Sequence, residues 1–97
     1  MIKIPNIVKI GGLDFTVEEK TDEVRDNGRT GCSSGTTQKI IIDKDISQQL
    51  KETTFIHELL HQVDYVYTIG LSHQQVYLLE ASIYAFLKNN PDMLDIN

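Results

Sequence analysis

Apolar and polar side chains alternate through much of the first half of the chain, which is the period-two pattern of β-strands. The alternating apolar positions are Ile4, Val8 and Ile10, followed by Leu13, Phe15 and Val17. Gly11 and Gly12 separate the two runs and supply the two-residue turn of a β-hairpin. Residues 38–43, QKIIID, predict a further strand, and the loop sequence between these strands leaves room for a short one near residues 30–33.

The spacing of apolar residues becomes helical in the second half of the chain. Ser47 or Asp45 can cap the start of a helix that contains no Pro or Gly before about Thr68. Ser72, with Gln75 three residues later, matches a capping box and predicts the start of a second helix. An Asn-Asn-Pro sequence ends that helix, because the residue before a proline disfavours the helical conformation.

These elements predict an α+β domain. We expect a small antiparallel sheet of three or four strands, packed on one helix and accompanied by a second. Residues 1–97 then form a single minimal domain, with a strand-rich half over 1–46, two helices over 47–90 and a tail over 91–97.

Composition and charge exclude several classes of protein. The chain has 9 Lys and Arg against 14 Asp and Glu, a net charge of -5, and no basic run, so we expect no nucleic-acid partner. Cys32 is the single cysteine, which rules out an internal disulfide and a thiolate zinc cluster. The first residues match neither a signal peptide nor a membrane span, and we therefore expect a cytoplasmic protein without a membrane partner.

The first predicted helix contains the sequence TFIHELLHQVD, in which two histidines lie four residues apart and a glutamate follows the first. Four residues is slightly more than one helical turn, so His57 and His61 project from one face and can grip a single ion. At about 100° per residue, Glu58 and Asp64 fall on the same side. The opposite, packing face is expected to hold Ile56, Leu59, Leu60, Val63 and Tyr67.

Two imidazoles and one carboxylate are typical ligands of a catalytic Zn²⁺, which keeps a position open for water. A nearby base must then take the proton of that water. Glu58 is adjacent to a ligand but turned about 100° from it, so it can contact the water without binding the metal. The simpler alternative is that two helix histidines coincide by chance, although chance does not explain the glutamate between them.

The third ligand is expected on the second helix. Glu80 lies at the centre of an apolar stripe that comprises His73, Val76, Tyr77, Ile83, Tyr84 and Leu87. A buried carboxylate needs a proton, a cation or a metal, and a metal held by the preceding helix meets that need. Asp64 is the rival, but on the same straight helix it is too short to complete a tetrahedron. It fits better as a partner of a ligand imidazole, or it is simply a solvated helix carboxylate.

His57, Glu58 and His61, followed by Glu80 on the next helix, resemble the gluzincin pattern of zinc metallopeptidases, whose best-known branch is thermolysin-like. The small size also resembles short HExxH proteins of phage and prophage genomes. The resemblance implies that the two histidines and Glu80 bind zinc, that Glu58 is the general base, and that residues 38–43 form the edge strand for an extended peptide.

The sequence departs from the gluzincin pattern in two places. Leu79 precedes Glu80 where the family has Asn, and no full C-terminal subdomain follows to supply an oxyanion-stabilising residue. His73 and Tyr77 are candidates for that role, because they lie on the stripe of Glu80. The alternative is that Tyr77 is a core aromatic residue and His73 a satisfied polar one.

The leading hypothesis is therefore a zinc metallopeptidase that acts on a peptide or protein substrate through a zinc-activated water. The alternative is a zinc-stabilised, non-catalytic interaction or regulatory module of phage type. Glu58 discriminates between them, since a structural site needs no base beside its ligand and favours a closed fourth position.

Overall fold

A computed structural model describes residues 2–21, 24 and 29–94 of the chain. The elements are the strands β1 (Ile7–Ile10), β2 (Leu13–Lys20), β3 (Gly31–Ser34) and β4 (Lys39–Asp43), the helices α2 (Gln48–Tyr67) and α3 (His73–Asn89), and the 3-10 helix η1 (Pro91–Leu94). The α+β fold class is confirmed. Part of the predicted loop, 22–23 and 25–28, and the end of the tail, 95–97, lie outside the described residues.

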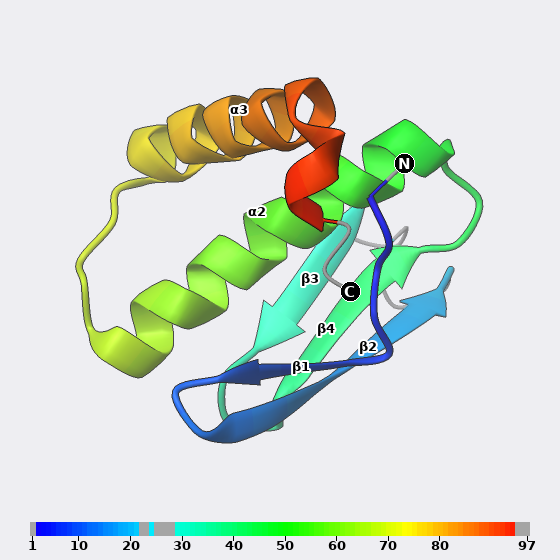
Figure 1. Cartoon of the computed structure of the whole chain (residues 1–97). Coiled ribbons are helices and arrows are strands. Elements are labelled where there is room, and N and C mark those ends of the chain that lie inside the picture. The colour runs from blue at the N-terminus through cyan, green and yellow to red at the C-terminus, as the bar shows by residue number, and fades with distance from the viewer. Residues whose placement is uncertain (1, 22–23, 25–28, 95–97) are drawn as a thin grey trace.

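The four strands form one sheet in the order β1-β2-β4-β3 (Figure 1). β1 and β2 pair as the predicted hairpin, with Ile10 opposite Leu13 across the two-glycine turn. β3 and β4 also pair antiparallel, but β2 and β4 run parallel. The sheet is therefore mixed, and the expectation of a wholly antiparallel sheet is wrong in this one pairing.

The central position of β4 has a reason in its sequence. Ile40, Ile41 and Ile42 are all buried, so both faces of this strand are covered. Such continuous apolar runs are typical of strands inside a sheet, whereas edge strands with one wet face alternate. The prediction that residues 38–43 form the edge strand is therefore wrong, and β3 takes that place instead.

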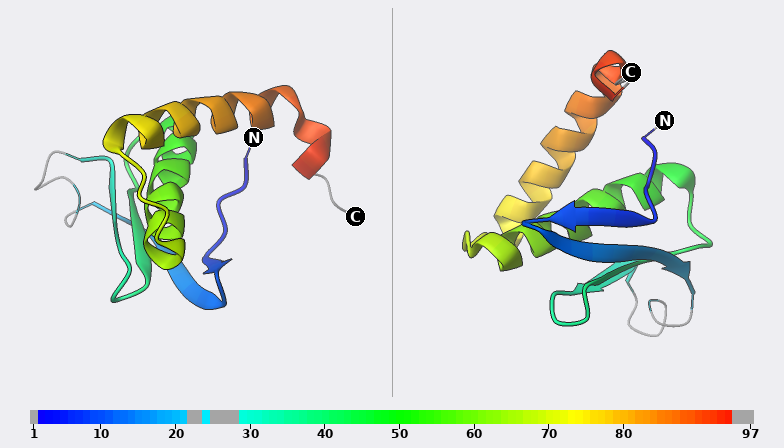
Figure 2. Two further views of the ribbon diagram at one scale, coloured as in Figure 1. Left: turned by 90° about the vertical axis from the view of Figure 1, so that its left-hand side faces the viewer. Right: turned by 60° about the horizontal axis from the view of Figure 1, so that its bottom comes forward.

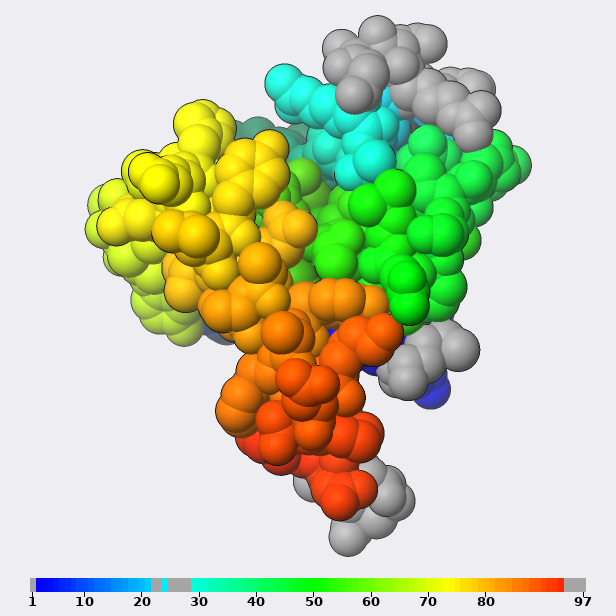
Figure 3. Space-filling model, turned by 90° about the horizontal axis from the view of Figure 1, so that it is seen from above, coloured from blue at the N-terminus to red at the C-terminus, as the bar shows by residue number. Residues whose placement is uncertain are grey.

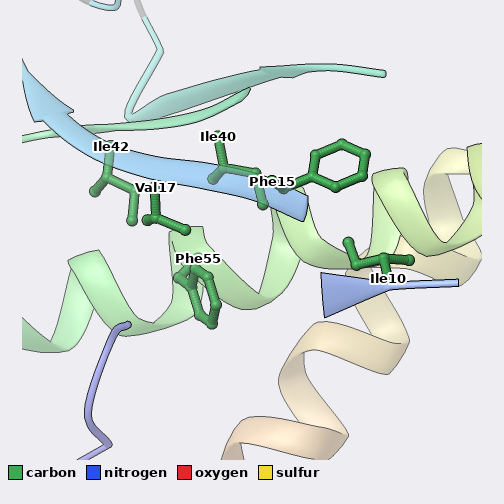
Figure 4. Close-up of a cluster of buried hydrophobic side chains, with 6 residues drawn as sticks. All are labelled: Ile10, Phe15, Val17, Ile40, Ile42 and Phe55. Atoms are coloured by element: carbon green, nitrogen blue, oxygen red, sulfur yellow. The ribbon is translucent and has the colours of Figure 1, made fainter. Parts of the chain in front are cut away.

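The hydrophobic core lies between the sheet and α2. Figure 4 shows the buried cluster of Ile10, Phe15, Val17, Ile40, Ile42 and Phe55. Leu59 and Val63 of α2 pack against this cluster, as predicted for the packing face of the helix. Tyr67 is an exception, with 61% of its surface exposed, because it is the last residue of the helix and lies beside the β1–β2 turn.

α3 lies across α2 on the side away from the sheet (Figure 2). Both helix starts agree with their capping residues: Ser47 accepts from Leu50 N–H, and Ser72 forms the complete capping box with Gln75. Val76 is the one buried residue that α3 contributes, so most of its surface is open. Within the described residues, neither helix combines the length and apolar character that a membrane crossing requires.

Candidate metal and catalytic site

A pocket of about 840 Å³ opens where β3, α2 and α3 meet. In Figure 3, part of α2 (green) is recessed between α3 (yellow to orange) and β3 (cyan). All six residues that the sequence nominated line this pocket: His57, Glu58, His61, His73, Tyr77 and Glu80. Tertiary structure therefore places the predicted metal-binding and catalytic side chains around one common space.

Two of the three predicted metal ligands, His61 and Glu80, contact the third, His57. His57 Nδ1 lies 2.7 Å from Glu80 Oε1, and His57 Nε2 lies 3.1 Å from His61 Nε2. About a fifth of each of the His57 and Glu80 side chains is exposed, so the pair borders the pocket without being sealed from it. The contact joins α2 to α3, as the assignment of Glu80 requires.

The contact with Glu80 bears on which nitrogen of His57 carries a hydrogen. Because a carboxylate only accepts, the 2.7 Å contact requires the tautomer in which His57 Nδ1–H donates to Glu80, and a neutral imidazole of that tautomer has a lone pair on Nε2. Burial lowers the pKa of His61, and the neighbouring His57 and His73 act in the same direction against Glu58 and Asp64. A lowered pKa favours the neutral imidazole, which is the form that binds metals.

The two histidines fit a zinc ion better than the carboxylate does. Zinc–nitrogen distances of about 2.0–2.1 Å in a tetrahedron place two ligand nitrogens about 3.3 Å apart. The 3.1 Å between the Nε2 atoms of His57 and His61 is close to that value. Glu80, however, contacts the other nitrogen of His57, and the described residues contain no group of three or more His, Cys, Asp or Glu side chains already disposed to hold a metal.

This geometry gives Glu80 two ways to serve a metal. If it stays on His57 Nδ1, it orients a ligand imidazole through the outer nitrogen, as carboxylates do in many zinc sites. If its side chain turns from Nδ1 toward the Nε2 side, it becomes the third ligand. Only in the second case would the chain supply two imidazoles and one carboxylate, the donor set that suits a catalytic zinc.

Glu58 points toward β3 and is only 8% exposed. Its Oε1 accepts a 2.6 Å hydrogen bond from Ser33 Oγ, and Gln62 Nε2 donates to the same Ser33 hydroxyl at 2.7 Å. Glu58 was expected on the metal side of α2, and its contacts with Ser33 and Gln62 were not predicted. The spacing of Thr54, Glu58 and Gln62, each four residues from the next, was the signal for a polar row on the helix.

The two candidates for stabilising an oxyanion both lie near the histidines. The ring of Tyr77 is 5.0 Å from that of His57, and the ring of His73 is 6.1 Å from that of His61, between ring centres. Tyr77 is exposed, so the alternative of a core aromatic residue is wrong. Both side chains line the pocket beside the two histidines.

Asp64 serves the loop between the helices. Its Oδ1 accepts from the backbone N–H groups of Gly70, at 2.6 Å, and Leu71, at 3.2 Å.

Glu52 is a buried carboxylate that was not predicted as a site residue. It accepts hydrogen bonds from Tyr84 Oη and Gln48 Nε2. The bond from Tyr84 joins α2 to α3 about one and a half helical turns before His57. A polar contact of this kind holds the helices together without belonging to the pocket.

No protein-family model, curated protein or solved structure matches this chain.

Proposed function

We propose that this protein is a zinc-dependent metallopeptidase, with His57, His61 and Glu80 as metal ligands and Glu58 as general base. The observation that supports it best is the convergence of the four side chains on one pocket wall. The Nε2 atoms of the two histidines lie 3.1 Å apart, and Glu80 reaches His57 from a different helix.

A bound zinc would supply a Lewis acid and lower the pKa of a water in its open position. The residues of the chain supply what remains. Glu58 takes the proton of the attacking water and later delivers it to the leaving amine. His73 and Tyr77 donate to the oxygen on which negative charge develops, because both stand at the pocket beside the ligand imidazoles.

β3 is the element that would hold an extended substrate. It is the edge strand of the sheet, and consecutive residues from Thr30 to Ser33 line the pocket. Its outer edge pairs with no strand in the described part of the chain, and an extended peptide could add to the sheet at that edge as a further strand. The proposed substrate is accordingly a peptide or an unfolded segment of a protein that binds as an added strand.

One observation favours the alternative, a zinc-stabilised interaction or regulatory module. The Glu58 carboxylate is nearly buried and hydrogen-bonded to Ser33, which is also how a purely structural carboxylate would lie. The two functions differ in what they demand of Glu58. An enzyme needs its basicity, whereas a module needs only a polar side chain of the same shape.

The test compares the wild type with Glu80→Ala and Glu58→Gln. Zinc per chain is measured by elemental analysis after zinc is supplied and excess is removed by dialysis, and hydrolysis is measured on a pooled library of quenched fluorescent peptides. We expect near-stoichiometric zinc in the wild type and Glu58→Gln, and little in Glu80→Ala. Glu58→Gln should lose about 10²- to 10⁴-fold in hydrolysis, the usual contribution of a general base.

Each alternative predicts a different pattern. Zinc in the wild type with no hydrolysis by any of the three proteins identifies the non-catalytic module. If the wild type and Glu80→Ala hold equal amounts of zinc, Glu80 is not a ligand. If Glu80→Ala binds zinc about 10- to 100-fold more weakly than the wild type, Glu80 only orients a ligand imidazole. A wild type that takes up no zinc contradicts both functions.

A further inference from the structure

Polar side chains form the seam between α2 and the edge strand β3. Thr54, Glu58 and Gln62 form one row on α2, and all three are buried. Thr54 Oγ1 donates to Thr30 Oγ1 at 2.9 Å, and the other two side chains meet at the hydroxyl of Ser33. Apolar side chains would pack there at a lower desolvation cost, so the row requires another explanation.

The backbone of β3 approaches α2 very closely at this seam. A Cβ added at Gly31 would lie 2.4 Å from Thr54 Cγ2 and 3.0 Å from the backbone oxygen of Ile41. A glycine is therefore needed at this point, and it brings the next residue on the same face of the strand, Ser33, against Glu58. β3 thus places the Ser33 hydroxyl within hydrogen-bonding distance of one oxygen of the Glu58 carboxylate.

The two hydrogen bonds at the Ser33 hydroxyl share one donor-to-acceptor direction, from Gln62 toward Glu58. Gln62 Nε2 donates to Ser33 Oγ, and Ser33 Oγ donates to Glu58 Oε1. Gln62 Oε1 is buried and has no hydrogen-bond partner among the described residues. An unsatisfied buried acceptor destabilises a fold, so packing alone does not account for Gln62.

We propose that Ser33 is a positioning residue for the general base, which makes this inference dependent on the proposed function. Its hydroxyl, oriented by Gln62, holds Oε1 of Glu58 and leaves Oε2 to take the proton of the attacking water. The carboxylate is thereby prevented from turning about its last torsion, a rotation that side chains of this kind make freely. A general base held in one orientation is ready at each encounter with substrate.

The test uses Ser33→Ala, Ser33→Thr and the matched control Ser34→Ala. Thr restores a hydroxyl at the same position, and Ser34 is the next residue on the strand, directed to the other face and bonded to Thr36. Crystal structures give the orientation of the Glu58 carboxylate, elemental analysis gives zinc, and the fluorescent peptide cleaved best by the wild type gives kcat and KM.

We expect Ser33→Ala to keep its zinc and its KM, to show more than one orientation of Glu58, and to lose about 10-fold or more in kcat. Ser33→Thr should recover both the single orientation and most of kcat, and Ser34→Ala should match the wild type. A role in stability alone would lower the midpoint of thermal unfolding without changing kcat per folded chain.

Two results would overturn this inference by itself. One is an unchanged Glu58 orientation in Ser33→Ala, and the other is an active wild type whose kcat the substitution does not alter. A wild type that binds zinc but cleaves no peptide of the library overturns the proposed function, and the catalytic role of Ser33 with it. The failure of the inference and the failure of the function are therefore distinguishable.

Discussion

The two sides of α2 are held to their neighbours in different ways. Toward the sheet, the helix covers a closed apolar core and forms a seam of buried polar side chains with β3. Toward α3, the helix makes the Glu80–His57 and Tyr84–Glu52 bonds and the ring contacts of His57 with Tyr77 and of His61 with His73, and α3 contributes a single buried apolar residue, Val76. One side is a packed interior, and the other is a few specific contacts between two helices.

The two sides of α2 therefore have different roles in the proposed function. The proposed base, Glu58, is attached to the packed side, where little can move. Glu80 is carried by α3, which buries fewer apolar residues than α2, and in the proposed function a metal would complete its position. A zinc bound between the helices would therefore contribute to folding stability mainly by joining α3 to the remainder of the protein.

The largest expected effect is a difference in the loss of unfolding free energy between two phenylalanine-to-alanine variants. Phe15→Ala empties a fully buried position of the sheet core and should lower the free energy of unfolding by about 3–5 kcal/mol. Phe86→Ala on α3 removes a side chain that is 52% exposed and should cost less than about 1 kcal/mol. Urea unfolding followed by circular dichroism measures both. Equal losses would mean that α3 belongs to the same packed unit as the sheet.

The next effect concerns zinc. At a free concentration about 100-fold above Kd, zinc should raise the free energy of unfolding by about 2.7 kcal/mol. Hydrogen exchange followed by mass spectrometry should show the largest gain in amide protection over α3, because Glu80 connects that helix to the histidines. Glu80→Ala should abolish the gain over α3. Protection of α3 by zinc in that variant would show that other contacts order the helix.

The smallest effect tests the seam on the packed side. Gly31→Ala places a methyl group against Thr54 Cγ2 and should cost about 1–3 kcal/mol of unfolding free energy, the usual range for overpacking. Thr54→Ser removes that Cγ2, so the double variant should recover part of the loss. Thermal unfolding of the two single variants and the double variant measures the coupling. Strict additivity would mean that β3 does not approach α2 as closely as described.

Local chemistry made several parts of the structure predictable. The two glycines after Ile10 placed the hairpin, and the serines at 47 and 72 marked both helix starts within a residue. The spacing of His57 and His61 was sufficient to bring them together, since a helix fixes the relation between residues one turn apart. Glu80 was expected to meet the preceding helix because a carboxylate on an apolar stripe requires a partner, and it contacts His57 there; its role as a metal ligand stays a prediction.

Other parts depended on contacts between distant segments. Ser33 and Glu58 are 25 residues apart, and no local pattern relates a strand residue to a helix residue at that separation. The insertion of β4 between β2 and β3, which made β3 the edge strand, likewise followed from the need to cover three consecutive isoleucines on both faces. Asp64 was left open between two roles, and the loop N–H groups that it accepts from became visible only in the fold.

The sequence by itself determined which side chains could do chemistry and which neighbours along one helix would stand together, because helix geometry and capping are short-range. Only the tertiary structure decided which strand borders the pocket, which hydroxyl holds Glu58, and which nitrogen of His57 faces Glu80. Those outcomes depend on how the sheet and the two helices pack, and packing is settled by the burial of the whole chain rather than by any one segment of it.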